Sequence, residues 1–266
     1  MYEPALRIRP AAVAGMFYAA DSQQLESDVL SYLHLSKSAI KGIPKAIIAP
    51  HAGYIYSGPV AASAYSLLKP YADQIKQVIL LGPAHRVAVQ GIATPDMDYF
   101  ETPLGQVKIN QTLCQKIERL NFVHGNSLAH SQEHSLEVHL PFLQTVLTDF
   151  ELTPLVVGDC NRQDVAQLLE LLWGDSQTLI VVSTDLSHFH DYNTALKLDQ
   201  QTSQAIQQLQ PDKILYDNAC GRNPLNGLLT LAQKKHLTVD LLDLRNSGDT
   251  AGDKDRVVGY GAYVVH

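Results

Sequence analysis

Three histidines of this 266-residue chain, His51, His85 and His188, stand at or just after the ends of apolar runs. A neutral imidazole is the commonest side chain for binding zinc, iron or copper. Because neighbouring strands lie about 4.8 Å apart, ligands on adjacent strand ends can converge on one ion. We therefore predict that His51, His85 and one further ligand form an open metal site. For either histidine alone, a structural bond to the backbone is the usual alternative.

The segment from residue 130 to residue 139 holds a second concentration of polar side chains. His130, Glu133 and His134 match the H-x-x-E-H pattern of zinc peptidases, in which the histidines bind zinc and the glutamate activates water. The apolar periodicity begins only after this pentad, so the pattern also fits a loop that leads into a helix. We then expect His134 to be an acid or base in the pocket, oriented by Glu133 or Glu137. A solvated polar helix start is the structural alternative.

Asp185 and His188 are three residues apart and follow another apolar run. On the first turn of a helix they would point the same way, so Asp185 is predicted to orient a ligand histidine or bind substrate. Helix capping is its structural alternative.

Cys220 precedes a predicted helix, whose positive end lowers the pKa of a thiol and favours a thiolate ligand. Its alternative is burial as a small apolar residue.

Four other features are expected to have mainly structural roles. Cys114 lies in a helix pattern and Cys160 in a loop, and both are interpreted as structural or incidental. The stretch 101–105 predicts a tight turn. The Gly/Asp-rich stretch 247–253 also predicts a turn, with lining the pocket or binding a cation as the functional alternative.

The elements that must position these side chains alternate between strand and helix. Asp21 and Gln24 predict a capping box at the start of a first helix, and Ser57 with Pro59 predict the start of a second. Apolar runs predict strands at 45–50, 77–83, 152–157, 178–183, 238–244 and 257–265, with a meander over 91–109. Periodic apolar positions predict helices at 21–35, 57–68, 137–147, 161–172, 192–209 and 224–235.

This alternation predicts an α/β fold, a three-layer αβα sandwich around a mostly parallel central sheet. The last two strands are expected to add an antiparallel edge. No repeat, low-complexity tract or linker divides the sequence, so residues 1–266 are expected to form one domain. In such sheets ligands bind beyond the carboxyl ends of the strands, where the three histidines are expected.

Composition argues against several classes of protein. The net charge is 20 − 27 = −7 without Lys/Arg blocks, which argues against nucleic-acid binding. No apolar run reaches the roughly 18 residues of a membrane span, and the N-terminal segment lacks the apolar region of a signal peptide. Three cysteines favour a reducing compartment, so a cytoplasmic protein is expected. The many Tyr and Gln residues permit a homo-oligomer.

The motifs, taken in chain order, resemble those of the Memo family. The matching blocks span nearly the whole chain: RPAAVAGMFY at 9–18, PHAGYIYSG at 50–58, LGPAH at 81–85, EHSLEVHLPF at 133–142, STDLSH at 183–188, CG at 220–221 and SGDTAGD at 247–253. The resemblance implies the fold of the class III extradiol dioxygenase catalytic subunit. It also implies a metal site of two histidines and a cysteine, which fall on His51, His85 and Cys220, in a pocket that Asp185 and His188 line.

The same resemblance implies a chemistry and partners. In these dioxygenases, a histidine in a block like Glu133–His134 acts as acid or base toward a catechol. The resemblance makes Fe(II) the first expectation. The third ligand of these dioxygenases is usually a carboxylate or histidine, whereas Cys220 is softer and favours copper, zinc or a differently tuned iron, so copper and zinc are the alternatives. Many prokaryotic members are encoded near a radical-SAM protein and an AMMECR1-like protein, as system protein B of that AmmeMemoRadiSam set. These two proteins are the expected partners.

Two functions are consistent with these residues. The first is a metal-dependent redox enzyme of dioxygenase type, with Fe(II) or copper on the three predicted ligands and with His134, Asp185 and His188 around an organic substrate. The second is a non-catalytic scaffold that binds a peptide or small ligand in the pocket of a vestigial enzyme. A zinc peptidase built on His130 and His134 is a distant third.

Overall fold

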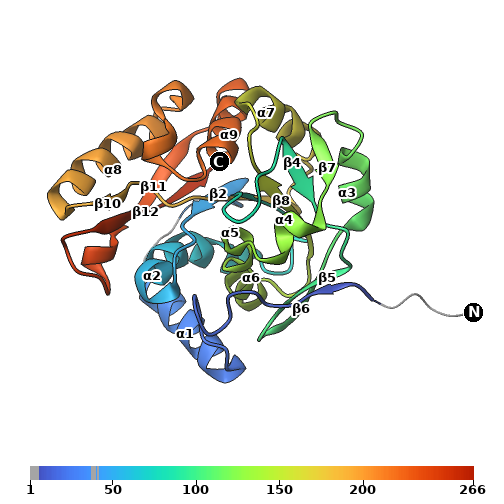
Figure 1. Cartoon of the computed structure of the whole chain (residues 1–266), viewed down its shortest axis with the longest axis horizontal. Coiled ribbons are helices and arrows are strands. Elements are labelled where there is room, and N and C mark those ends of the chain that lie inside the picture. The colour runs from blue at the N-terminus through green and yellow to red at the C-terminus, as the bar shows by residue number, and fades with distance from the viewer. Residues whose placement is uncertain (1–5, 37–39, 41) are drawn as a thin grey trace, which may run out of the picture.

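The computed structural model describes residues 6–36, 40 and 42–266. Its centre is a nine-stranded sheet in the order β10-β12-β2-β9-β3-β8-β4-β7, with β11 also paired to β12 (Figure 1). The strands of this sheet are β2 (Ala46–Ala49), β3 (Gln77–Pro83), β4 (Ile92–Thr94), β7 (Val123–Gly125), β8 (Glu151–Val157), β9 (Thr178–Ser183), β10 (His188–His190), β11 (Val239–Asn246) and β12 (Val257–Val265).

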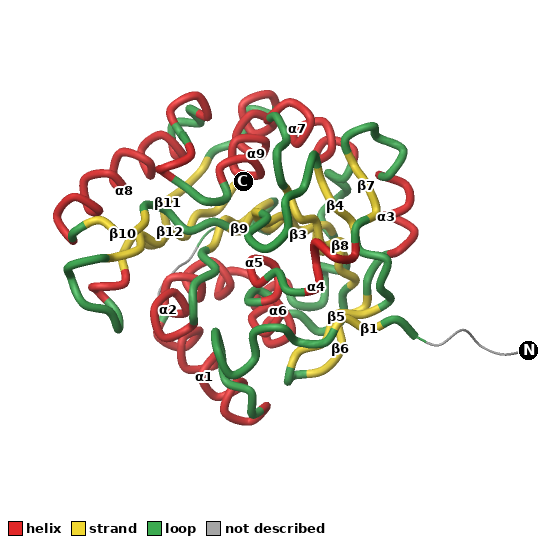
Figure 2. Tube along the Cα trace, viewed as in Figure 1, coloured by secondary structure: helices red, strands yellow, loops and turns green. Residues whose placement is uncertain are grey.

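Helices cover both faces of this sheet (Figure 2). One face carries α1 (Ser22–Leu35), α2 (Tyr54–Tyr65), α5 (His134–Glu137) and α6 (Leu140–Val146), and the other carries α7 (Arg162–Leu171), α8 (Tyr192–Gln207) and α9 (Arg222–Lys234). The other described helices are α3 (Gln111–Ile117), α4 (Ser127–Ser131) and short 3-10 turns at 66–71, 211–213, 216–218 and 247–249. Two clusters of buried apolar side chains fill the two interfaces. The predicted three-layer αβα sandwich is confirmed.

Four central strands, β2, β9, β3 and β8, are parallel neighbours, and their apolar runs are buried on both faces. Their carboxyl ends therefore lie along one edge of the sheet, which brings the residues after β2, β3 and β9 together. The predicted antiparallel edge is confirmed, because β12 runs antiparallel to both β2 and β11. None of the helices in the described ranges is long and apolar enough to cross a membrane.

The stretch 91–109 does not form one meander. β4 joins the main sheet, antiparallel to β8, whereas β5 (Tyr99–Thr102) and β6 (Gly105–Lys108) form a hairpin. This hairpin pairs with β1 (Ile8–Arg9) in a separate three-stranded sheet. The predicted tight turn at 101–105 is confirmed as the hairpin turn.

The starts of the first two helices show what local sequence can and cannot fix. Asp21 caps α1 as predicted, and its Oδ1 accepts the Gln24 amide at 2.9 Å. The return bond of the capping box is absent, because the Gln24 side chain donates to Asp28 instead. The second helix begins at Tyr54, before the predicted start, because the Tyr54 amide donates to the carbonyl of Phe17 far back in the chain. Pro59 consequently lies inside α2.

The helix predicted over 137–147 is confirmed over most of its length as α6, but it starts three residues later, at Leu140. The chain forms two short helices, α5 and α6, separated by Val138 and His139. The break has a local cause: Pro141 has no amide hydrogen, so it cannot donate to the carbonyl of Glu137 as a continuous helix requires. The division gives the polar residues of α5 an orientation independent of the apolar α6.

Candidate metal centre

His51 follows β2 and is held in one orientation by a relay of two hydroxyl groups. Its Nδ1 lies 2.6 Å from Ser183 Oγ at the end of β9, and this hydroxyl donates to the carbonyl of Ser135 on α5 at 2.6 Å. Because the Ser183 proton is used in that bond, Ser183 accepts from His51 Nδ1–H. Nε2 of His51 therefore keeps its lone pair. Burial and the neighbouring His85 lower the pKa of His51 well below its usual value, so the ring is neutral.

His85 follows β3 and is oriented by a buried carboxylate. Glu133 Oε1 lies 2.9 Å from His85 Nδ1, and Glu133 Oε2 accepts the His85 amide at 2.6 Å. Glu133 is only 1% exposed, and its bonds to His85 hold its pKa down to about 2 against the opposing effect of burial. An anionic acceptor at Nδ1 leaves Nε2 as the free nitrogen of His85, as in metal-binding histidines whose other ring nitrogen donates to a carboxylate.

His134 begins α5, as predicted, and its ring completes a cluster of three. The ring stacks on His85 with centroids 4.6 Å apart and lies edge-on to His51 at 5.5 Å. One nitrogen from each of His51, His85 and His134 lies within 4.8 Å of the others. Nδ1 of His134 is buried without a hydrogen-bond partner, although Glu133 Oε1 is 3.4 Å away. Such a spare nitrogen needs an explanation, and an ion or ligand supplies one.

Cys220 stands just before α9 and reaches the same cluster. Its Sγ lies 3.3 Å from Nε2 of His51, the nitrogen that carries the free lone pair, and accepts the Asp185 amide at 3.3 Å. The predicted lowering of the thiol pKa is wrong for the protein without a cation. Burial, with Asp185 nearby, raises the pKa of Cys220 to about 12, and this outweighs the helix terminus.

Asp185 and His188 lie beside the cluster but not on a helix. Residues 184–187 are irregular and His188 begins β10, so the predicted shared helical turn and the capping alternative are both wrong. Asp185 Oδ1 accepts the His51 amide at 2.8 Å, and burial raises the pKa of this carboxyl to about 7. Its Oδ2 is 3.8 Å from His51 Nε2. Burial lowers the pKa of His188.

His130 and Glu137 point away from the cluster. Nε2 of His130 donates to the carbonyl of Ala93, and among the described residues His130 shares no metal-sized group with His134. The peptidase pattern is therefore not realised in space. Glu137 does not orient His134, because its oxygens accept bonds from Arg9, Tyr18 and two amides of the N-terminal segment. Cys114 and Cys160 are buried, which agrees with their interpretation as structural.

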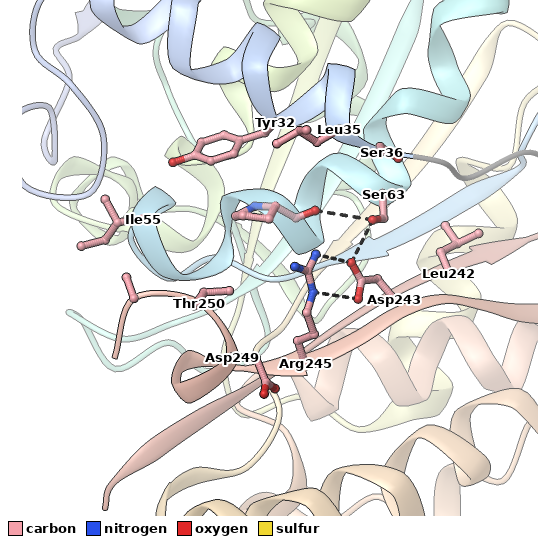
Figure 3. A pocket seen from close by; sticks show the side chains of 12 residues that line it. Tyr32, Leu35, Ser36, Ile55, Ser63, Leu242, Asp243, Arg245, Asp249 and Thr250 are labelled. Carbon is pink, nitrogen blue, oxygen red and sulfur yellow. Dashed lines mark hydrogen bonds and ion pairs between the residues drawn. The ribbon is translucent and has the colours of Figure 1, made fainter. Parts of the chain in front are cut away.

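Two cavities open onto the cluster, and His188 lines both. One has a volume of about 600 Å³ and is lined by Pro83, Ala84, His85, His188, His190, Tyr216, Asp217 and Cys220. The other, of about 410 Å³, reaches His134 and Asp185 and is lined in addition by aromatic side chains and by the 247–253 loop. That loop therefore does line the pocket. A third cavity of about 690 Å³, between α1, α2 and β11, has no histidine or cysteine in its lining (Figure 3).

Sequence reasoning missed the residues that fix the histidines rather than the histidines themselves. Ser183 and Ser135 stand inside the motifs but gave no separate signal, because their roles depend on β9 meeting α5. Glu133 was expected to serve His134, whereas it binds His85. Phe17, whose ring lies 4.7 Å from that of His134, could be found only from the fold.

Comparison with known proteins assigns the chain to a family. Residues 9–264 match the family described as Memo-like protein. A MEMO1 family protein of Aquifex aeolicus is 35% identical, over 96% of this chain and 98% of the relative, and one of Thermoplasma volcanium is 32% identical, over 97% and 98%. The crystal structure of an uncharacterized protein from Escherichia coli, 12% identical, has a TM-score of 0.55 and matches 82% of this chain and 99% of that chain, which shows a shared fold. Sequence and structure together show that this chain belongs to the Memo family.

Proposed function

We propose that this Memo-family protein binds a metal ion and uses it on an organic substrate. Fe(II) is the first expectation, with copper and zinc as alternatives, and His51 and His85 are the two fixed ligands. The observation that carries the proposal is the cluster itself, in which two imidazoles have Nδ1 occupied and Nε2 left for a ligand. When bound, the metal would supply Lewis-acid and redox chemistry toward dioxygen at an open coordination position.

Cys220 fits the third ligand position. Donors at about 2.3 Å (sulfur) and 2.0 Å (nitrogen) on one tetrahedral ion lie roughly 3.5 Å apart. The observed separation of Cys220 Sγ and His51 Nε2 is 3.3 Å. His134 is the rival for this position, because one nitrogen from each of the three histidines lies within 4.8 Å of the others. On the shorter separation of Cys220 and His51, we assign Cys220 to the metal and leave His134 free for proton transfer.

His134, Asp185 and His188 have the properties of proton-handling groups. Burial lowers the pKa of His134 to about 4, so its imidazole is neutral at pH 7 and can accept a proton from a substrate in the 410 Å³ cavity. The pKa of Asp185, about 7, lets this carboxyl give or take a proton near neutral pH. His188 lines both cavities and would orient a ligand from either side.

The test is elemental analysis of protein purified and loaded without oxygen. Wild type is expected to hold close to one equivalent of iron or copper, and His51→Ala and His85→Ala to hold only background amounts. Cys160→Ser is the matched control, because this cysteine is buried outside the cluster. Unchanged metal content in both histidine variants, with the control also unchanged, would exclude the site.

The third ligand is tested separately with Cu(II) or Co(II) as a spectroscopic probe. A thiolate ligand gives a sulfur-to-metal charge-transfer band, which Cys220→Ser is expected to abolish. His134→Gln is expected to keep the band and to lose substrate turnover. If the band persists in Cys220→Ser and the metal is lost in His134→Gln, the ligand set is the three histidines instead.

The rival function is a binding scaffold that uses the same cavities without turnover. It is favoured by the third ligand, a cysteine in place of the carboxylate or histidine expected from the dioxygenase resemblance. Metal-free protein that binds an organic ligand as tightly as loaded protein, with no oxygen consumed, would favour the scaffold. Oxygen consumption that depends on both substrate and His85 would exclude it.

A further inference from the structure

Arg256 is an exposed cation on the wall of the 410 Å³ cavity, which also reaches His134, Asp185 and His188. Within the described residues its guanidinium has neither an ion pair nor a side-chain hydrogen bond. The guanidinium lies over the ring of Phe189, with its central carbon 5.1 Å from the ring centroid. A planar guanidinium with unused donors matches the two oxygens of a carboxylate.

The comparison with Arg245 shows that an arginine beside a cavity need not be available. Arg245 lines the 690 Å³ cavity, and its guanidinium forms a two-point bond with Asp243, which also accepts from Ser63 (Figure 3). That arginine is neutralised by the protein itself. Arg256 has no such carboxylate partner in the described structure, so its charge is open to a ligand.

Phe189 holds Arg256 at the mouth of the cavity. Its backbone has φ of +62°, a left-handed conformation that bulky residues rarely adopt. The residue is 61% exposed, so the conformation does not bury it in the core. It places the ring under the guanidinium, where a cation–π contact limits the directions that Arg256 can take.

The walls of the same cavity are aromatic and apolar. Phe17, Tyr56 and Tyr260 line it together with Ala52 and Val258. These side chains offer flat, weakly polar surface in the cavity that Arg256 and His134 both line. A volume of about 410 Å³ is at the small end of ligand sites and suits a ligand of one ring.

The two cavities beside the histidines differ in the charged side chains of their walls. Asp253 and Asp185 also line the 410 Å³ cavity, but each already accepts backbone amide bonds: Asp253 from residues 255 and 256, Asp185 from His51. The 600 Å³ cavity has Asp217 on its wall and no arginine or lysine in its lining. Of these two cavities, the 410 Å³ one is therefore the one whose lining offers an arginine to an anion.

We propose that Arg256 is a specificity residue that selects an organic carboxylate with a ring, and holds the carboxylate at the mouth while the ring points toward His134. The proposal names the ligand class of the site proposed above. We call this contact between Arg256 and the ligand carboxylate the carboxylate clamp. It needs no metal, so it can succeed or fail independently of metal binding.

The probe is benzoate, with benzamide as its neutral counterpart, measured by calorimetry on metal-free and metal-loaded protein. Wild type is expected to bind benzoate at least about tenfold more tightly than benzamide, the range of a charged hydrogen-bonded contact. Arg256→Gln is expected to remove this preference in both forms of the protein. Arg222→Gln is the matched control, because Arg222 also lies over an aromatic ring, Tyr216, but does not line this cavity.

The outcomes separate the clamp from the metal site. Equal binding of benzoate and benzamide by wild type, or the same loss in Arg222→Gln as in Arg256→Gln, would overturn the clamp even if the metal binds. An Arg256-dependent preference in protein that takes up no metal on loading would support the clamp, while the failure to load would contradict the metal proposal. Phenyl phosphate binding more tightly than benzoate would overturn the choice of carboxylate. Phe189→Ala is expected to weaken benzoate less than Arg256→Gln does.

Discussion

Two polar clusters at the ends of α5 differ in how fully their hydrogen bonds are used. At Glu137 the carboxylate accepts from Arg9, Tyr18 and two backbone amides, and Arg9 uses its other nitrogens on the carbonyls of His130 and Glu133. At the His134 end, one nitrogen from each of three histidines lies close to the others, Cys220 Sγ lies beside that of His51, and Nδ1 of His134 has no hydrogen-bond partner. The closed cluster, around Glu137, fixes the N-terminal segment, whereas the open cluster, around His134, can accept an ion. The difference lies in how many metal-binding atoms come together, because single unpartnered nitrogens also occur at His130 and His139.

The largest effect is expected from breaking the closed cluster. Arg9→Met leaves a buried carboxylate unpaired, which should cost about 3–5 kcal/mol of unfolding free energy, measured by urea denaturation. Metal affinity of the remaining folded protein should change less than about tenfold, well below the loss expected in His85→Ala. His85→Ala, at a partly exposed side chain, should cost little stability. A large loss of metal affinity in Arg9→Met, or a large loss of stability in His85→Ala, would show that the two clusters are not separate in function.

Glu133 belongs to the open cluster although it is fully buried, and Glu133→Gln tests that assignment. The amide oxygen can still accept from His85 Nδ1, but the amide nitrogen then faces the His85 backbone amide, donor against donor. Metal affinity is expected to fall about 10–100-fold, measured by competition with a chelator. Glu118→Gln is the control, because Glu118 accepts from Thr94 outside the cluster. An equal loss in both variants would point to net charge rather than orientation.

Buried histidines outside the open cluster give a pH test. Burial lowers the pKa of His139 to about 3, while in the unfolded chain it is about 6.5. Between these values the unfolded chain binds one more proton, so stability falls as the pH drops from 6.5 toward 3, by about 1.4 kcal/mol per pH unit for this residue. His139→Phe should reduce the slope of unfolding free energy against pH by that amount. An unchanged slope would mean that His139 is not buried in its neutral form.

The strands that carry the site could be predicted because their apolar runs, such as those of β3 and β9, are buried on both faces. The strand-end histidines could be located from those runs. The start of α2 could not, because the carbonyl that accepts the Tyr54 amide belongs to Phe17, distant in sequence. The pKa of Cys220 was misjudged for a similar reason, since the helix terminus is a local feature and burial is not.

The smallest expected effect concerns the hydroxyl that fixes His51. Ser183→Ala removes the acceptor for His51 Nδ1–H and the donor to Ser135, two buried bonds whose loss should cost roughly 1–3 kcal/mol. Nitrogen-15 NMR of the imidazole should then show a mixture of the two neutral tautomers in place of one, and metal affinity should fall only a few-fold. Ser63→Ala, which removes a hydroxyl bond to Asp243 at the 690 Å³ cavity, should leave the tautomer unchanged. A single His51 tautomer in both variants would assign its orientation to the surrounding packing rather than to Ser183.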